Sequence, residues 1–239
     1  MAESRNPKAK AYLELDDVSR LESAATNLRD RLLVRVLCHL GCRVSEAVAL
    51  TVDDVDLADG TVKILHLKSR IQISCPQCNA RLGRSHSFCP KCGSKVSQTV
   101  KKAQTHRRLR TLPLDGDTLA MLKEYIERAG PIKKNGKLMI FCINRHRAWQ
   151  IVRDCAEKAG LDDLVNPETG RKRGISPHRL REAFAIRAVK RDDSGDGLRM
   201  LQVHLGHSSF DTTARYRTVS GDDLKAWHHR IWNEGKDND

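Results

Sequence analysis

Four cysteines near the middle of the chain constrain its fold more than any other feature. They form two Cys-x-x-Cys pairs separated by ten residues, and each pair has the residues of a tight turn: Cys75-Pro76-Gln77-Cys78 and Cys89-Pro90-Lys91-Cys92-Gly93. Four thiolates at this spacing can complete a tetrahedral zinc site, and the segment has too few apolar residues to fold without one. Two disulfides are the alternative, which the lack of an export signal argues against. We therefore predict a structural zinc module over residues 70–100.

The other four cysteines lie in apolar surroundings, which predicts small buried side chains and no nucleophile. They are Cys38, Cys42, Cys142 and Cys155.

Positive charge is concentrated around the cysteines. The chain has a net charge of +13, and no Asp or Glu occurs from Gly60 through Leu114. A run of charge is usually only a solvated surface, but this one has no internal counter-charge, so it predicts contact with nucleic acid. The candidate DNA-binding residues are Arg70, Arg81, Arg84, Lys91, Lys95, Lys101, Lys102, Arg107 and Arg108, with Arg179 further along the chain.

The remaining composition predicts one hydrophobic core. Of the 239 residues, 39% are hydrophobic, and no apolar stretch approaches the roughly 20 residues of a membrane span. The first six residues lack the apolar run of a signal peptide, so we expect a cytoplasmic protein with no membrane partner.

Apolar periodicity predicts a mainly helical chain. Residues 61–67 and 108–114 are the predicted strands, and if they form a hairpin, the zinc module is an insertion in its loop. We expect Asp16 or Asp17 to cap the first helix, and Ser176 with Pro177 to begin a later one. The predicted helical ranges are 13–50, 115–129, 145–158, 176–191, 198–205 and 211–219, with a possible helix over 224–232.

Tyr216 stands out among the three tyrosines because Arg215 and Arg217 flank it. Cationic neighbours stabilise a phenolate, whose unperturbed pKa is about 10, so Tyr216 is a candidate nucleophile. A surface tyrosine beside bound phosphates would explain the same context.

Four ordered segments resemble the motifs of the tyrosine recombinase (phage integrase) family. The resemblance covers residues 13 to about 219 apart from the zinc module, and it implies that residues 1–239 form that family's catalytic domain, a mainly α fold with a small antiparallel sheet (α+β). The segments are Gly41-Cys42-Arg43-Val44-Ser45-Glu46, Ser176-Pro177-His178-Arg179-Leu180-Arg181, Leu205-Gly206-His207 and Thr212-Thr213-Ala214-Arg215-Tyr216.

The resemblance implies site-specific cleavage and rejoining of DNA, as in recombination or the integration of a mobile element. Tyr216 would attack the scissile phosphate, leaving a 3′-phosphotyrosyl bond and a 5′-hydroxyl. Arg43 and Arg181 would bind the non-bridging oxygens. His178 would act in proton transfer with Tyr216, and His207 would donate to the phosphate. Plain phosphate anchoring is the alternative for each cation.

The same resemblance implies a lysine as general acid for the leaving 5′-oxygen. Lys68, at the end of the first strand, is the candidate, with Lys101 and Lys102 as alternatives. Glu46 would support the region around Arg43. The family needs neither ATP nor a catalytic metal, so zinc would be the sole cofactor, in a structural role.

Two features depart from the family's pattern. Glu182 follows Arg181 where relatives often have histidine or another small or polar residue, which would change the local electrostatics. Only 42 residues precede Arg43, so we expect no separate N-terminal core-binding domain. The chain would be a fragment or a minimal enzyme, in which the zinc module extends the hairpin along the DNA.

Three other functions fit parts of the sequence. Carboxylates at Asp53, Asp54 and Asp56, or at Asp192, Asp193 and Asp196, could hold magnesium in a nuclease, although their positions suggest caps and turns. A non-catalytic zinc-ribbon DNA-binding protein and a type IB-like DNA-relaxing enzyme are the others. The family recombines double-stranded DNA as a tetramer, often by donating a C-terminal helix, which residues 224–232 could form or could bury on their own domain.

Overall fold

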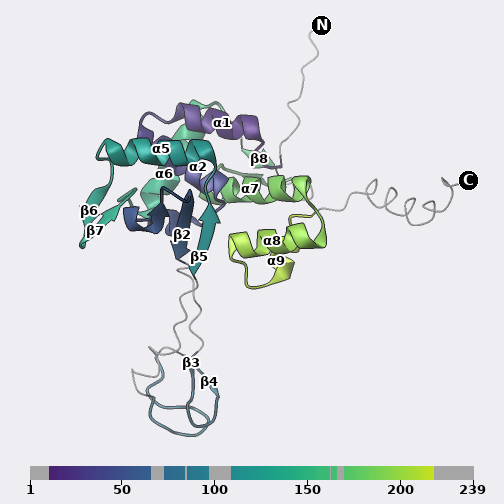
Figure 1. The fold of residues 1–239 in the computed structure, drawn as a ribbon. Helices are drawn as coiled ribbons and strands as arrows, with labels where there is room; N and C mark the ends of the chain where they lie inside the picture. The colour runs from purple at the N-terminus through teal and green to yellow at the C-terminus, as the bar shows by residue number, and fades with distance from the viewer. Residues whose placement is uncertain are drawn as a thin grey trace, which may run out of the picture.

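The computed structural model describes residues 11–65, 73–83, 85–96, 109–161, 163–165 and 170–217. Helices dominate these ranges, with small antiparallel sheets between them (Figure 1). None of the helices described is long and apolar enough to cross a membrane. The mainly helical class predicted from the sequence is therefore confirmed.

Helices α1 (Leu15–Ala24) and α2 (Leu28–His39) pack against each other and form much of the core. The predicted cap of α1 is wrong, because the helix begins after Glu14, and Asp17 instead accepts a hydrogen bond from the Glu14 backbone N–H at 3.0 Å. After α2 the chain turns through Gly41 at φ +55°. A Cβ there would lie 2.5 Å from the Phe184 ring, so both the conformation and the close packing require glycine.

The main sheet has the strand order β1-β2-β5. Strand β1 (Val55–Asp56) follows the short helices α3 (Val44–Ala47) and η1 (Val52–Asp54), and β2 (Thr61–Leu65) pairs antiparallel with β5 (Leu109–Pro113). The register pairs Ile64 with Arg110 and Leu65 with Leu109. The predicted hairpin is confirmed, and the cysteine segment lies between its strands in the sequence. Its predicted ends at residues 66–67 and 108 lie outside the described residues.

Helix α5 (Gly116–Glu127) starts at the predicted Asp115 cap, and α6 (Arg145–Lys158) has the predicted limits. Between them, β6 (Ile132–Lys134) and β7 (Lys137–Met139) form a hairpin that the sequence analysis missed. Its signal was Asn135-Gly136, both at positive φ, since this dipeptide is typical of two-residue hairpin turns. The expected loop after α6 contains the short pair β8 (Leu164–Val165) and β9 (Lys172–Arg173).

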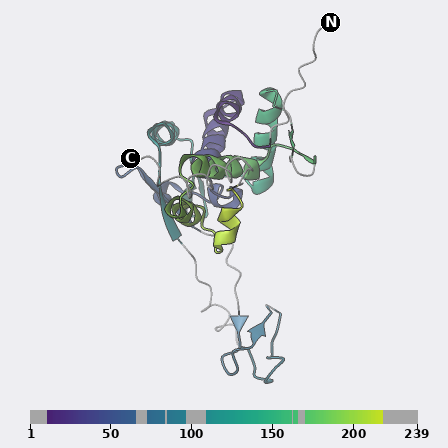
Figure 2. The same ribbon diagram turned by 90° about the vertical axis from the view of Figure 1, so that its right-hand side faces the viewer.

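Three helices complete the fold beside strand β5 (Figures 1 and 2). Helix α7 (Pro177–Arg191) begins with Pro177 as predicted. Helix α8 (Gly195–Leu205) begins three residues earlier than predicted, because the Ser194 side chain caps it. Helix α9 (Phe210–Ala214) ends before Tyr216, so the prediction that Tyr216 lies within this helix is wrong. A second core joins α7 and α8 through Ala185, Val189, Leu198, Leu201 and Leu205.

The cysteine segment forms a small unit with a core of its own. Strands β3 (Ile73–Ser74) and β4 (Arg81–Leu82) pair antiparallel, and Cys75, Leu82, Cys89 and Val96 are buried together. The unit has few apolar side chains, as the sequence predicted, so another interaction must hold it together.

Candidate active site

Arginines from three different elements gather around one buried carboxylate. Glu46 in α3 has a side chain only 1% exposed. Its Oε1 lies 3.1 Å from Arg43 Nη1, and its Oε2 lies 2.8 Å from Arg110 Nη2 on β5. The Arg43 backbone N–H also donates to Oε2 at 2.9 Å. The predicted supporting role of Glu46 has a clear geometric basis here.

Glu46 is ionised in this environment. Burial alone would raise its pKa, but the hydrogen bonds from Arg110 and from the Arg43 backbone lower the pKa to about 2. A single negative charge is therefore shared between Arg43 and Arg110. Arg181 lies nearby, since Arg43, Glu46 and Arg110 all affect its pKa. The cluster keeps an excess of positive charge that a phosphate can neutralise.

Arg181 connects three parts of the fold. Its side chain on α7 is buried, and its Nη1 donates to the Gly41 carbonyl at 2.6 Å while Nη2 donates to the Leu205 carbonyl at 2.9 Å. These bonds link α7 to the loop before α3 and to the end of α8. Burial and the neighbouring Arg43 lower the pKa of Arg181 to about 10, which still leaves the guanidinium charged at neutral pH.

His207 lies directly beside Arg181. Its Nε2 is 2.9 Å from Arg181 Nη2, and its Nδ1 is 2.9 Å from Thr213 Oγ1. Because arginine can only donate, Nε2 is the acceptor, and Nδ1 carries the hydrogen that bonds Thr213. Burial and Arg181 lower the pKa of His207 to about 4, so the ring is neutral. Donation from Nε2 to a phosphate would therefore require another protonation state and a shift of Arg181.

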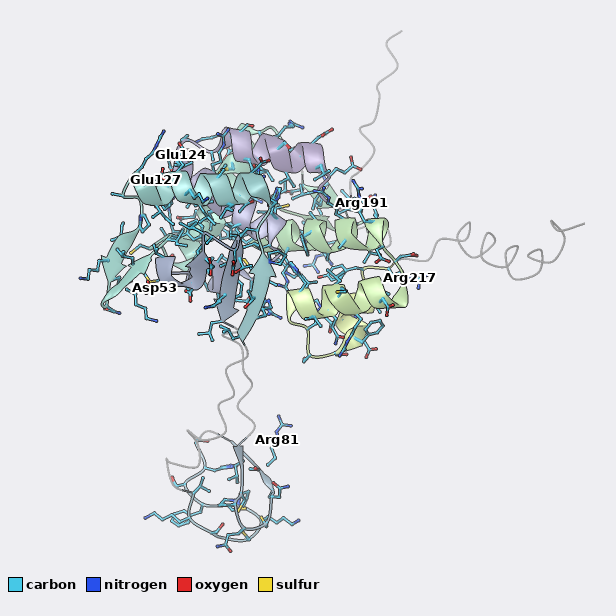
Figure 3. The ribbon with its side chains drawn as sticks, viewed as in Figure 1. Asp53, Arg81, Glu124, Glu127, Arg191 and Arg217 are labelled. Carbon is cyan, nitrogen blue, oxygen red and sulfur yellow. The ribbon has the colours of Figure 1, made fainter. Side chains whose placement is uncertain are left out.

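Tyr216 lies in the turn after α9, with its ring stacked near His207. The ring centroids are 6.3 Å apart and the planes differ by 20°. Burial raises the pKa of Tyr216, and the largest opposing effects come from Arg181 and Arg179. The flanking arginines do not have the predicted effect. Arg217 pairs with Asp193 at 3.2 Å beside the start of α8 (Figure 3), and Arg215 is exposed.

His178 and Arg179 begin α7, one turn before Arg181. Partial burial of the ring and the neighbouring Arg179 lower the pKa of His178. Arg179 forms an ion pair with Glu182, the residue that departs from the family's pattern. Glu182 therefore neutralises a predicted DNA-binding cation.

Several predicted residues lie outside the part of the chain that the structure describes. They are Lys68, Arg70, Arg84, Lys101, Lys102, Arg107 and Arg108, together with the proposed tail helix over 224–232. Conversely, the sequence analysis did not select Arg110 as a site residue. It was one cation in a basic run, and its partner Glu46 is 64 positions away.

The cysteine unit has the geometry of a metal site. The four Sγ atoms all lie within 4.8 Å of one another, and Cys75–Cys92 and Cys78–Cys89 are each 3.5 Å apart. Tetrahedral zinc with Zn–S bonds near 2.3 Å needs sulfur atoms about 3.8 Å apart, so this set fits. All four cysteines are free in this structure, with no disulfide among them. Ser94 Oγ lies 3.1 Å from both Cys75 Sγ and Cys92 Sγ.

Most of the carboxylates considered for a nuclease have other roles. Asp54 bonds the backbone N–H and hydroxyl of Thr51, and Asp56 accepts from turn N–H groups. Asp192 accepts from the Ser194 N–H. Within the described ranges, the four cysteines are the only cluster of three or more potential metal ligands. The observed contacts are those of caps, turns and ion pairs.

Comparison with known proteins identifies the family. The sequence matches the Phage integrase family over residues 11–222, a range that includes the arginine cluster, both histidines and Tyr216. The chain belongs to this family. It is 33% identical over 227 residues to tyrosine recombinase XerC of Herpetosiphon aurantiacus, covering 90% of this chain and 57% of that protein. It is 28% identical over 206 residues to tyrosine recombinase XerD of Corynebacterium glutamicum, covering 83% and 51%.

Solved structures share the fold of this chain. XerA recombinase has a TM-score of 0.59 at 20% identity, covering 97% of this chain and 66% of its own. XerH site-specific recombinase, bound to its difH substrate in a pre-cleavage complex, has a TM-score of 0.58 at 20% identity, covering 95% and 55%. The predicted fold is thus confirmed. The chain spans about half the length of the curated relatives quoted.

Proposed function

We propose that the chain is the catalytic part of an enzyme that cleaves and rejoins double-stranded DNA at specific sites through a 3′-phosphotyrosyl intermediate. The arrangement of Arg43, Arg181 and His207 beside Tyr216 carries this proposal. A scissile phosphate bound by the two arginines would lie near the tyrosine ring, in a partly buried setting where ionic hydrogen bonds are strong. Zinc chemistry has no part in the reaction.

In the proposed cleavage step one bond at phosphorus replaces another, one proton leaves Tyr216, and a second proton reaches the leaving 5′-oxygen. The Tyr216 oxygen attacks the phosphorus, the bond to the 5′-oxygen breaks, and the non-bridging oxygens remain bound by Arg43 and Arg181. A raised pKa keeps Tyr216 protonated in the free protein, so a base must take its proton. His178, whose pKa is lowered, can accept this proton at neutral pH. Lys68 gives a proton to the 5′-oxygen. The reverse steps rejoin the strand.

The decisive experiment uses nicked suicide DNA that carries candidate sites, because loss of the short 5′-hydroxyl strand traps the covalent complex. We expect a protein–DNA adduct with the wild type and none with Tyr216→Phe. Tyr12→Phe is the matched control. Tyr12 lies near the start of the described residues, and its hydroxyl contacts Lys190 on α7, not the arginine cluster. Tyr12→Phe should form the adduct normally. An adduct that survives in Tyr216→Phe would exclude Tyr216 as the nucleophile.

Full strand exchange requires several copies of the chain. Two duplexes have four strands to cleave and each copy supplies one Tyr216, so we include a homotetramer on DNA in the proposal. A DNA-relaxing enzyme with the same chemistry would instead act as a monomer. Relaxation of supercoiled plasmid without candidate sites would favour that alternative, whereas recombinant products that appear only with paired sites would favour recombination.

We further propose that the cysteine unit, within an insertion over residues 70–100 of one catalytic domain, binds structural zinc and contacts DNA. The fit of the four thiols to tetrahedral zinc supports the metal. Arg81, Lys91 and Lys95 are exposed on the unit, and the Arg81 side chain points away from it (Figure 3). Replacing residues 75–95 with a short turn should weaken DNA binding and reduce its dependence on salt. Unchanged affinity and salt slope would contradict the DNA contact.

A further inference from the structure

Arg110 is the cation of the cluster that no motif of the sequence points to. It lies on β5 opposite Ile64, and its side chain is only 11% exposed. Its Nη2 is 2.8 Å from Glu46 Oε2, and its Nη1 is 3.4 Å from Oε1. Such burial leaves little of the guanidinium for a substrate to reach, so any effect on the reaction must pass through its neighbours.

The first neighbour is Glu46, which also binds Arg43. Arg43 uses one Nη atom for Oε1, while Arg110 binds mainly Oε2, so the two arginines divide one carboxylate between them. Without Arg110, Arg43 would have to neutralise a larger share of the buried charge of Glu46. Arg43 would then be held back toward the carboxylate and would bind a phosphate less well.

The second neighbour is the turn that presents His207. Gly206 ends α8 in the left-handed conformation at φ 66°, and a Cβ on it would lie 3.0 Å from Arg110 Nη1. The guanidinium is thus packed against the backbone directly before His207. Arg110 is also among the cations that lower the pKa of His207, after burial, Arg181 and Arg43. The side chain contacts both the Glu46 group and the His207 turn.

We propose that Arg110 is a positioning residue that neutralises Glu46, so that Arg43 can bind the scissile phosphate, and that holds the Gly206 turn so that His207 faces the same phosphate. This inference rests on the proposed cleavage reaction and adds a residue on the hairpin strand to its machinery. It also gives β5 a direct part in the site, because the strand that follows the cysteine insertion supplies the counter-charge for the α3 carboxylate.

The test compares single-turnover cleavage of suicide DNA by the wild type, Arg110→Gln and Arg110→Lys. One substrate has a normal scissile phosphate, and the other has a methylphosphonate, which lacks one anionic oxygen and needs less arginine binding. Displacement of a phosphate-binding group typically costs on the order of 10²-fold in rate. We expect a loss of that order for Arg110→Gln on the normal substrate, a clearly smaller loss on the methylphosphonate, and partial recovery with Arg110→Lys.

Arg35→Gln is the matched control. Arg35 is similarly buried, at 12% exposed, and pairs with the buried Glu22 between α1, α2 and α5. Arg35→Gln should lower the thermal midpoint. At temperatures well below that midpoint, any loss in cleavage rate should be the same for both substrates.

Adding Glu46→Gln to Arg110→Gln removes the carboxylate charge that would hold Arg43 back, so the double variant should cleave no more slowly than Arg110→Gln. Three results would overturn the positioning role. They are an equal loss of cleavage rate on both substrates, additive losses of rate in the double variant, and a wild-type cleavage rate in Arg110→Gln. A wild type that forms no adduct would instead overturn the proposed function itself. Thermal midpoints of every variant identify any that fail to fold, and Arg110→Lys retains the charge if Arg110→Gln does fail.

Discussion

At the scale of single residues, His207 shows how the surroundings determine a side chain's chemistry. Burial and three arginines disfavour its protonated form and lower its pKa to about 4. Free histidine has a pKa near 6.5, so the ring is neutral at pH 7 and bonds Arg181 as an acceptor. The motif identified His207 from the sequence, but it could not reveal this protonation state, which depends on residues from α3, β5 and α7.

The lowered pKa predicts how stability depends on pH. Between about pH 6.5 and pH 4 the unfolded chain binds a proton at residue 207 that the folded chain does not, so folding stability decreases as the pH falls through this window. Above it, His207 contributes no pH dependence. His178 and His204 also have lowered pKa values and act in the same direction. The difference between the wild type and His207→Gln therefore isolates residue 207.

We expect the free energy of unfolding, measured with urea at pH 7.5, 6, 5 and 4.5, to decrease more steeply in the wild type than in His207→Gln. The two curves should run parallel above about pH 6.5 and converge or cross below it. Parallel curves over the whole range would show that His207 titrates alike in the folded and unfolded chains.

At the scale of elements, Asp115 fixes the start of α5 against α2. It accepts a hydrogen bond from the Thr118 backbone N–H at 3.0 Å and pairs with Arg35 at 2.9 Å and His39 at 3.2 Å. Burial alone would raise its pKa, but the bonds from Thr118 and Arg35 hold the pKa of Asp115 well below its usual range. One residue therefore combines a helix cap with an ion pair between helices.

Asp115→Ala should lower the free energy of unfolding by about 1–2 kcal/mol, because it removes an N-cap and a partly exposed ion pair. Asp115→Asn keeps the capping oxygen and should lose less. Asp117→Asn is the control, since the Asp117 side chain is 88% exposed although it also contacts Arg35, and its effect should stay within about 0.5 kcal/mol. Equal losses for Asp117→Asn and Asp115→Ala, measured by urea unfolding at pH 7, would contradict the capping argument.

Local signals explain which elements could be predicted from the sequence. Asp115 and Ser176-Pro177 mark where α5 and α7 begin, and α6 has a regular apolar face. The pairs β6–β7 and β8–β9 are two or three residues long, so the strand pattern is too short to recognise even where Asn135-Gly136 marks the turn. The early end of α9 was missed because Tyr216 packs on the second core, a tertiary contact that helical periodicity does not encode.

At the scale of the whole molecule, the cysteine unit has a core separate from the two cores of the helices and the main sheet. The main core draws on the helices from α1 to α7 and on the sheet, whereas the cysteine unit buries only Cys75, Leu82, Cys89 and Val96. Two of these four buried residues are themselves proposed zinc ligands. The proposed catalytic residues Arg43, Arg181, His207 and Tyr216 belong to the part of the fold built on the main core and on the core of α7 and α8, which contains none of the four cysteines. Stability of the cluster should therefore be independent of the metal.

This separation predicts that chelation unfolds the cysteine unit and leaves the main domain folded. The wild type should bind one zinc ion per chain. Cys92→Ser should abolish this binding, whereas Cys142→Ser should retain it, because Cys142 lies far in sequence from the four proposed ligands. In EDTA, hydrogen exchange should become fast at residues 73–96, while protection in α2, α6 and α7 and the main thermal transition stay nearly unchanged, because the helices keep their own core. Exchange that becomes fast in both parts together would show that the metal also stabilises the catalytic fold.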